Sequence, residues 1–309
     1  MGLGGALFWS GLVRNLKEQY PEKRIVFVYA RTWEAIKARI PISDHQIYKH
    51  NPDIFVMIPR PFWKLLRVLF KRRFFLVVKM DHPDYHYCSG ETSERIFFKT
   101  GKHAIQVSCD VHRISPAKLT PKIVLTHREV IHAQQILKSN QLQPKRYICV
   151  EPHIKTVSPN KAWFWERWQA VVDRLNVNIA ENYSEVQIVQ IGTKTNRTLN
   201  DVANLAGRSS FREVAEILRE ALFFVSYMGG LIHLSKAVGT RNVVLISSWE
   251  PKELASYPDD INLYTEIDCQ NCGLKVPCPI ERECMRRITV EMVVEACQTM
   301  LAEEYGKYA

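Results

Sequence analysis

The stretch from Ala221 to Ser247 constrains the fold more than any other part of this 309-residue chain. Its apolar run Phe223 to Ser226 can be buried on both faces, as the strands of a parallel sheet are. The pair Gly229-Gly230 breaks that run, and a short helix, a Gly-Thr turn and a second apolar strand follow. Two successive residues without Cβ let backbone N–H groups and the positive end of a helix dipole approach a phosphate. The pattern predicts a strand-turn-helix phosphate cradle, with an ordinary tight turn as the alternative.

Strand-like and helix-like segments alternate along the chain, a pattern typical of parallel sheets with crossover helices. The length and the 46% apolar content support an α/β fold of about two domains. A polar link at 140–145 favours a boundary that gives domains 1–143 and 144–309. The expected strands are 24–29, 54–58, 74–78, 147–150, 186–191, 223–226 and 242–246. The expected helices are 7–20, 126–139, 163–175, 199–206, 211–220 and 290–304.

The net charge of +10 is divided unevenly between the two halves of the chain. Residues 1–150 carry 25 Lys+Arg against 11 Asp+Glu, whereas residues 151–309 carry 17 against 21. A basic half indicates an anionic partner, either nucleic acid, an acidic membrane surface or a phosphorylated glycolipid. In the densest basic segment, 60–79, aromatic and aliphatic residues interleave with Arg and Lys. We interpret it as a basic amphipathic helix on a bilayer face or, equally, as a surface helix packed on its own domain.

The sequence shows no apolar run of the roughly 18 residues that a spanning helix needs, and no secretory signal pattern. The expected location is therefore the cytoplasm, with peripheral contact to the inner membrane surface through 60–79. The chain opens on a Gly-rich turn that leads straight into a helix, and the strand that normally precedes such a turn is expected to be missing.

Four segments carry a resemblance to a known family: the Gly-rich start at 2–16, SPNKAWFWERW at 158–168, LAGRSSFREVAEILREA at 205–221 and MGGLIHLSKAVGT at 228–240. They resemble glycosyltransferase family 9, the ADP-heptose:lipopolysaccharide heptosyltransferases and their relatives. The resemblance implies a GT-B architecture, in which two Rossmann-like parallel-sheet domains face a cleft. It implies inverting transfer of a sugar, heptose from ADP-heptose in the family, to a lipopolysaccharide-core-like glycan, another anionic glycolipid or a protein. The transfer requires no cofactor in this fold.

The resemblance also assigns residues to the nucleotide-sugar donor in the C-terminal domain. Lys161 matches the family Lys that neutralises the diphosphate, whose charge grows as it leaves. Thr156 and Ser158 lie where family hydroxyls bond phosphate oxygens. His233 matches the family His, with a core residue that holds the loop as the alternative. The phosphate loop itself is expected at Met228, Gly229, Gly230 and Leu231.

Two positions depart from the family pattern. Gly5, beside Gly4 on the acceptor side of the N-terminal domain, occupies the place of the Asp that serves as general base. Met228 replaces the Asp that holds the hydroxyls of the donor sugar, and a thioether is a weak hydrogen-bond acceptor. The alternative function is therefore a catalytically impaired member that binds a nucleotide-sugar or glycolipid without transfer. A nucleic-acid partner is not expected, because no helix-turn-helix, RRM-like or finger spacing is present.

Inverting transfer still needs a base, because a sugar hydroxyl is a poor nucleophile until its proton is removed. Asp110, flanked by His103 and His112 in the basic half, is the predicted substitute. Asp81 and His82 are the second choice.

A cysteine-rich loop, 269–284, ends the set of candidate sites. Its four thiols, within 16 residues, suit a tetrahedral cage for structural zinc or iron that would close the loop. The spacing differs from that of a standard zinc ribbon, so free thiols are the alternative. Four protein ligands leave no open position, which makes a catalytic role for the metal unexpected. The predicted ligands are Cys269, Cys272, Cys278 and Cys284.

Overall fold

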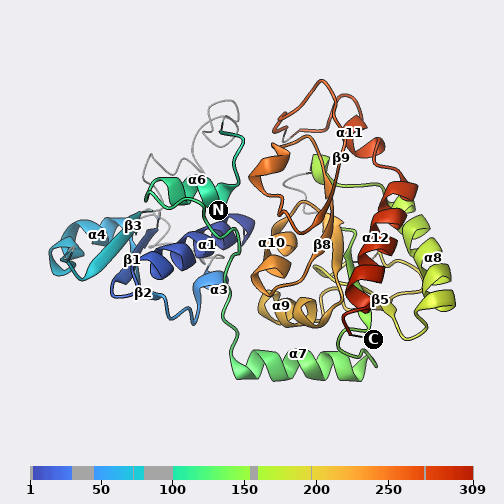
Figure 1. The fold of residues 1–309 in the computed structure, drawn as a ribbon, viewed down its shortest axis with the longest axis horizontal. Coiled ribbons are helices and arrows are strands. Elements are labelled where there is room, and N and C mark those ends of the chain that lie inside the picture. The colour runs from blue at the N-terminus through green and yellow to red at the C-terminus, as the bar shows by residue number, and fades with distance from the viewer. Residues whose placement is uncertain are drawn as a thin grey trace. The chain divides into compact units, whose positions relative to one another are not determined.

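The chain forms two compact units, 1–124 and 125–309, in the computed structural model shown in Figure 1. Each unit is built on its own parallel sheet. The structure describes residues 3–29, 45–71, 73–79, 100–153, 159–195, 197–274 and 276–308.

Among the described residues of the first unit, three strands form a parallel sheet of order β2-β1-β3. The central strand β1 is the most buried, and Val26, Phe27 and Val28 are 0% exposed. Helices α1 and α6 approach closely, since a Cβ at Gly11 would lie 2.6 Å from Ile105 Cδ1. The elements are α1 (Leu3–Gln19), β1 (Arg24–Tyr29), α3 (His45–Tyr48), β2 (Ile54–Pro59), α4 (Arg60–Leu66), the 3₁₀ turn η1 (Arg67–Leu69), β3 (Phe75–Lys79) and α6 (Ala104–Asp110).

The second unit contains a six-stranded parallel sheet of order β6-β5-β4-β7-β8-β9. Its central strands are buried on both faces, as the continuous apolar runs predicted, and β7 and β8 have no exposed residue. The strands are β4 (Tyr147–Glu151), β5 (Gln187–Gln190), β6 (Ala203–Asn204), β7 (Phe224–Tyr227), β8 (Asn242–Ile246) and β9 (Ile261–Tyr264). The helices are α7 (His127–Ser139), η4 (Pro159–Lys161), α8 (Trp165–Asn182), α9 (Phe211–Glu220), α10 (Gly230–Ala237), η5 (Lys252–Leu254), α11 (Glu283–Arg286) and α12 (Val290–Tyr305).

Helix α7 belongs to the second unit, although the sequence placed the boundary after it, at 143/144. Thr126 and Glu129 form a capping box that starts the helix. The buried Arg212 of α9 donates from Nε to Glu129 Oε1 over 2.6 Å. This bond lowers the pKa of Glu129 to about 2. The ion pair fixes α7 against α9, and the compact units therefore divide at 124/125.

The predicted α/β class is confirmed, and every predicted strand forms within two residues of its expected ends. The predicted helix at 199–206 is wrong. Its residues form a turn and the short strand β6, because Gln190 accepts the N–H of Leu199 at its side chain (2.8 Å) and that of Leu205 at its carbonyl (2.8 Å). The Gly-rich turn expected at the start is also wrong, since Gly4 and Gly5 already lie in α1. Strand β9 and helices α3, α6 and α11 were not predicted.

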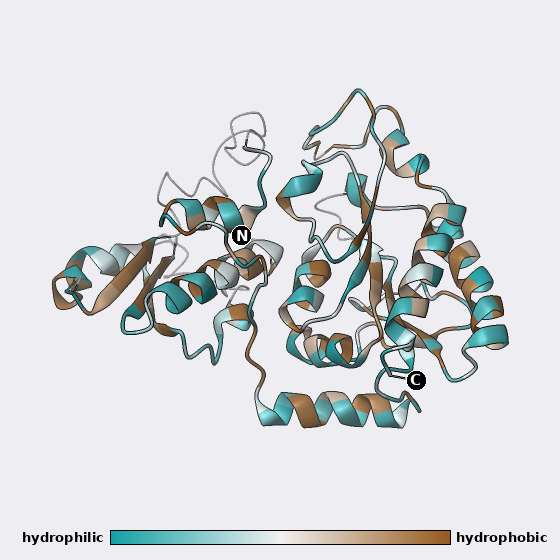
Figure 2. Cartoon of the chain, in the orientation of Figure 1, coloured by the Kyte–Doolittle hydropathy of each residue, from teal (hydrophilic) through white to brown (hydrophobic). Residues whose placement is uncertain are grey.

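The segment 60–79 is helical only at its start. Helix α4 and η1 end by Leu69, and the segment then returns to the sheet as β3. Strands β1 to β3 are largely brown in the hydropathy colouring of Figure 2, whereas teal and brown alternate along a surface helix such as α7. No helix in the described part of the chain has the length and apolarity to span a membrane.

Candidate functional site

The candidate site lies at the carboxyl ends of the strands of the second sheet. Strand β4 is followed in the chain by β5 on one side of it, while its other neighbour, β7, comes later. This reversal is a topological switch point, and ligands of open parallel sheets bind outside the strand ends there. The loops that leave β4 and β7 lead to the predicted donor-binding residues.

The turn between β7 and α10 has the geometry of a phosphate cradle. Gly229 is the N-cap of α10, and no side chain caps the helix. Its first N–H groups are therefore available to an anion, with the helix dipole behind them. A Cβ at Gly229 would lie 3.1 Å from Cε2 of Tyr227, which explains a residue without a side chain at this position. Met228 lies deeper, 2% exposed, and its N–H extends the ladder to Leu245 O over 3.0 Å.

His233 holds the first turns of α10 to the loop before β9. Its ring is buried, and Nδ1 lies 3.0 Å from the hydroxyl oxygen of Tyr257. This geometry is that of the alternative named from the sequence, a buried histidine that fixes the loop through a hydrogen bond.

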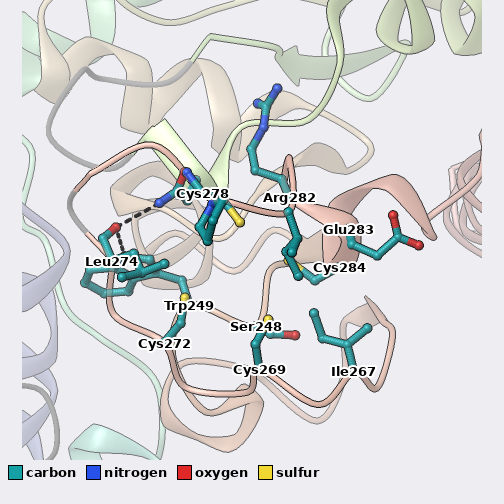
Figure 3. A pocket seen from close by; sticks show the side chains of 13 residues that line it. Ser248, Trp249, Ile267, Cys269, Cys272, Leu274, Cys278, Arg282, Glu283 and Cys284 are labelled. Carbon is teal, nitrogen blue, oxygen red and sulfur yellow. Dashed lines mark hydrogen bonds between the residues drawn. The ribbon is translucent and has the colours of Figure 1, made fainter.

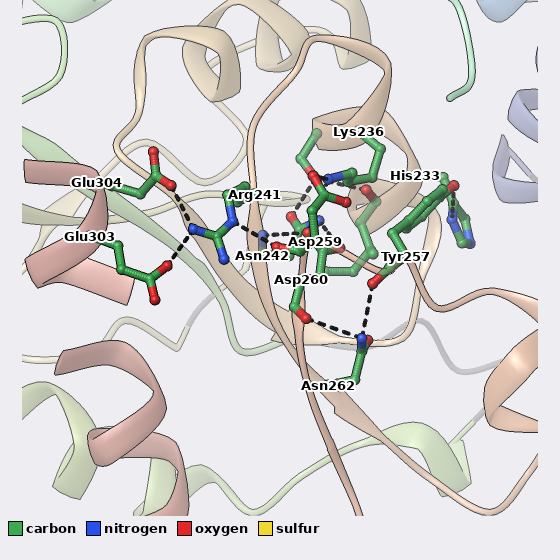
Figure 4. Close-up of polar contacts among 12 residues, drawn as sticks. His233, Lys236, Arg241, Asn242, Tyr257, Asp259, Asp260, Asn262, Glu303 and Glu304 are labelled. Atoms are coloured by element: carbon green, nitrogen blue, oxygen red, sulfur yellow. Dashed lines mark hydrogen bonds and ion pairs between the residues drawn. The ribbon is translucent and has the colours of Figure 1, made fainter. Parts of the chain in front are cut away.

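A second set of polar contacts, drawn in Figure 4, fixes the other end of α10. The ammonium of Lys236 lies 2.6 Å from Asp259 Oδ2 and 3.1 Å from Asp260 Oδ1. The side chain of Asp260 is completely buried, and its carboxylate accepts hydrogen bonds from the backbone N–H of Asn242 (2.9 Å) and from Asn242 Nδ2 (2.6 Å). Burial raises the pKa of Asp260 to about 6, despite these donors. Both ends of the short helix are thus tied to the β9 side of the sheet.

Lys161 ends the η4 turn, after the loop that leaves β4. Its ammonium forms an ion pair with the carboxylate of Glu250, in the loop after β8, and lies 4.4 Å from the centroid of the Trp249 ring. The Lys161 and Glu250 side chains are 13% and 14% exposed. The cation that the sequence assigned to the diphosphate is therefore held by a carboxylate and an aromatic face.

Glu151 is a candidate that the sequence analysis missed. It is the last residue of β4, beside the switch point, and its Oε2 lies 3.4 Å from the hydroxyl of Ser226 on β7. Gly192, just after β5, has φ +126°, and a Cβ there would lie 3.3 Å from Glu151 Oε1. The glycine leaves room for the carboxylate at the strand ends. The available signal was an acidic residue directly after the apolar run YICV.

The four cysteines of the 269–284 loop line one pocket, shown in Figure 3. Partial burial and, after it, the nearby thiols of the other three raise the pKa of Cys269. As placed, no three His, Cys, Asp or Glu side chains in the described ranges are grouped as ligands of a metal ion. The donor set fits a soft metal, but its thiols are not gathered into a coordination sphere. The pocket is lined by Cys269, Cys272, Cys278 and Cys284, together with Asn160, Trp249 and neighbouring residues.

Asn160 and Trp249 connect this pocket to Lys161. The buried Asn160 donates from Nδ2 to the carbonyls of Leu274 (3.0 Å) and Val276 (2.8 Å), and its Oδ1 accepts the N–H of Cys278 (3.2 Å). The indole N–H of Trp249 donates to Leu274 O over 2.9 Å. Asn160, which precedes Lys161, and Trp249, whose ring lies beside the Lys161 ammonium, are thus both hydrogen-bonded to the cysteine loop.

In the first unit, Asp110 lies at the end of α6. Its carboxylate accepts from Lys102 Nζ (2.7 Å) and Gln106 Nε2 (2.6 Å). His103 is the buried N-cap of the same helix and accepts the N–H of Ile105 at Nδ1 (3.2 Å), and burial lowers its pKa to about 3. Burial also lowers the pKa of His112. These two histidines are therefore neutral at physiological pH.

Some predicted positions lie outside the described residues. They are Thr156 and Ser158 of the donor loop and the second-choice pair Asp81 and His82. Gly4 and Gly5 are described, and both lie in α1, where Gly5 is buried.

Comparison with known sequences identifies one family. Residues 116–281, more than half of the chain, match the sequence profile of glycosyltransferase family 9 (heptosyltransferase). No curated protein matches the chain.

Solved structures share the fold at low sequence identity. The glycosyl transferase family 9 protein from Veillonella parvula is 16% identical, with a TM-score of 0.69 over 98% of this chain and 95% of that one. E. coli heptosyltransferase WaaC, solved with ADP, is 13% identical, with a TM-score of 0.58 over 97% of both chains. The dodecameric iron-containing heptosyltransferase TibC from enterotoxigenic E. coli, solved with ADP-D-β-D-heptose, is 13% identical, with a TM-score of 0.52 over 92% of this chain and 77% of that one.

Proposed function

Since the chain belongs to glycosyltransferase family 9, we propose that it is an inverting glycosyltransferase that uses an ADP-sugar, with ADP-heptose as the first candidate. Its two Rossmann-like units are those of the GT-B architecture. The second unit would bind the nucleotide-sugar, and the basic first unit would bind the acceptor, a lipopolysaccharide-core-like glycan or another anionic glycan. WaaC was solved with ADP and TibC with ADP-D-β-D-heptose, which supports this donor.

One observation supports the donor site. The uncapped N-terminus of α10 follows β7, and Lys161 follows the neighbouring strand β4, so both come after the carboxyl ends of strands in the same sheet. Backbone N–H groups at Gly230 and Leu231 would receive the diphosphate, and Lys161 would exchange its contact with Glu250 for a phosphate oxygen. N–H groups and a cation aimed at the leaving diphosphate stabilise the transition state more than the ground state, because negative charge grows on the diphosphate as the bond breaks. The family's reaction needs no further cofactor.

Deprotonation of the acceptor is proposed for Asp110, which is ordered by Lys102 and Gln106. Gly5 and Met228 support the alternative, a member that binds the donor without transferring it. Glu151 is proposed to accept hydrogen bonds from the sugar hydroxyls that the family Asp, replaced here by Met228, would hold. It lies at the end of β4, the strand beside β7.

Calorimetric titration with ADP, UDP, GDP and ADP-heptose tests the donor site. We expect ADP-selective binding that Lys161→Ala weakens by about 10-fold or more, because it removes a charge-assisted contact with phosphate. The control is Lys138→Ala, an exposed lysine on α7 of the same unit. Binding of none of the nucleotides would contradict the proposal. ADP-heptose binding without hydrolysis or transfer to any extracted glycan would favour the impaired alternative.

We further propose that the four cysteines of the loop hold a structural zinc or iron ion. TibC is iron-containing, and four thiols around one pocket form a suitable donor set. The ion would fix the loop that Asn160 and Trp249 join to Lys161. Metal analysis of the purified protein should find about one ion per chain, largely lost in Cys272→Ser but retained in the control Cys297→Ala. An ion content near zero in the unaltered protein would refute the site.

A further inference from the structure

An exposed apolar patch occupies one end of the first unit. Of the large apolar side chains that the structure describes as exposed, half lie between Phe55 and Phe74. Leu65, Val68 and Leu69 are the most open, at 72%, 74% and 65% exposure. They belong to the run 64–69 at the end of α4 and in η1, in which every residue is exposed. We call residues 64–69, 71, 73 and 74 the 64–74 patch.

The apolar residues of this segment divide into two sets. Phe62, Trp63 and Phe70 pack against the small core that contains Val26 and Ile58. The rings of Trp63 and Phe70 stack with their centroids 5.8 Å apart. The core contact is therefore made by the aromatic set, and the aliphatic set at 65, 68 and 69 is left on the surface. Packing on its own domain, the second interpretation of the sequence, accounts for the first set only.

The charge around the exposed set is of one sign. Lys64, Arg67, Lys71 and Arg73 are all exposed, and no Asp or Glu occurs between Asp53 and Asp81 in the sequence. The structure gives Lys64, Arg67 and Lys71 no acidic partner within ion-pair distance among the described residues. Exposed aliphatic side chains of this number are costly in water unless a partner covers them.

We propose that the 64–74 patch docks the first unit on an anionic lipid bilayer. Leu65, Val68 and Leu69 enter the boundary between headgroups and acyl chains, and the surrounding Lys and Arg side chains contact lipid phosphates. A second copy of the chain is a poorer occupant, because two patches of the same positive charge would repel. Nucleic acid would satisfy the cations but would leave Leu65, Val68 and Leu69 uncovered, because aliphatic side chains do not stack on bases. This inference is independent of the donor proposed above.

Co-sedimentation of the full chain with vesicles that contain no glycan tests the docking. We expect binding to vesicles of phosphatidylcholine mixed with phosphatidylglycerol, little binding to phosphatidylcholine alone, and weakening at high salt. Leu65→Ser/Val68→Ser/Leu69→Ser should reduce partitioning by about 10-fold or more. Lys64→Gln/Arg67→Gln/Lys71→Gln should reduce it by at least as much, because each cation near an anionic surface adds to the affinity.

The matched control is Arg128→Gln/Ile131→Ser/Lys138→Gln on α7, which removes exposed residues of the same types elsewhere. It should bind vesicles as the unaltered protein does. Circular dichroism verifies the fold of every variant. The proposal is overturned if the unaltered protein stays in the supernatant, if both patch variants bind like the control, or if the chain binds single-stranded RNA and not the vesicles. If the unaltered protein binds vesicles but not ADP, the donor site is refuted and this inference stands.

Discussion

Lys161 is paired with Glu250, although both side chains are mostly buried, and the ring of Trp249 lies under the ammonium. Removing such charges from water is costly, so the carboxylate compensates for a cation that would otherwise be desolvated. A diphosphate that reached Lys161 would compete with Glu250 for the same ammonium. The ion pair holds the ammonium in place, and it would oppose binding of the proposed diphosphate.

Glu250→Gln should strengthen ADP binding by about 3- to 10-fold, because the competing negative charge is removed while the shape of the side chain is kept. Isothermal calorimetry at low salt measures the change. The control is Glu253→Gln, an exposed residue of the next turn, which should leave affinity unaltered. Weaker binding in Glu250→Gln would show that the carboxylate contacts the nucleotide itself and does not compete with it.

Asn160 makes a different test possible, because its side chain is hydrogen-bonded to the cysteine loop. Asn160→Ala removes three hydrogen bonds of a buried amide, and we expect a loss of about 1–3 kcal/mol in the free energy of unfolding. ADP affinity should also fall, since Lys161 is the next residue. Chemical denaturation and calorimetry measure the two effects. Asn176→Ala, which removes an exposed bond to Asp201 O, should change neither.

The fold was largely predictable because its signals are local. Runs such as 223–226 and 242–246 are apolar throughout, which marks strands buried on both faces before any contact is known. The prediction of a helix at 199–206 was wrong because Gln190, on the neighbouring strand β5, accepts backbone hydrogen bonds from that segment at its side chain and its carbonyl. A tertiary contact of this kind leaves no pattern in the segment itself.

The candidate site was predictable only where a motif marked it. Motifs indicated Gly229 and Lys161 as candidates, whereas no motif indicated Glu151 or Glu250, because their proximity to the other candidates depends on which strands are neighbours. The same limit applies to the cysteine loop, whose spacing indicated a cluster but not its bonds to Asn160. Strand order brings these residues together, and no spacing in the sequence encodes it.

Glu151 tests the proposed sugar pocket. Glu151→Gln should leave ADP affinity within about 2-fold but weaken ADP-heptose by about 10-fold, because a carboxylate accepts hydrogen bonds from hydroxyls more strongly than an amide. Parallel titrations with the two ligands separate the effects. Glu185→Gln, at an exposed carboxylate bonded to Arg146, is the control. Equal weakening of both ligands would mean that the substitution disturbs the β4 end as a whole.

Asp260 makes stability depend on pH. Burial raises the pKa of its carboxyl to about 6, while an unfolded chain returns it to an ordinary value near 4. Between these values the folded protein holds a proton that the unfolded chain has lost. The resulting contribution to stability is complete below about pH 4 and is lost as the pH rises through about 6.

Asp260→Asn should abolish this contribution, because an amide does not titrate. Relative to the variant, the unaltered protein should lose up to about 3 kcal/mol of unfolding free energy between about pH 4 and pH 7, from the size of the pKa shift. Urea denaturation at a series of pH values measures the difference. Asp259→Asn removes the other carboxylate that is bonded to Lys236. The pKa of Asp259 is lowered in the folded protein, so this variant should retain the decline in stability between about pH 4 and pH 7. A constant difference between the unaltered protein and Asp260→Asn at all pH values would mean that Asp260 stays ionised beside Lys236.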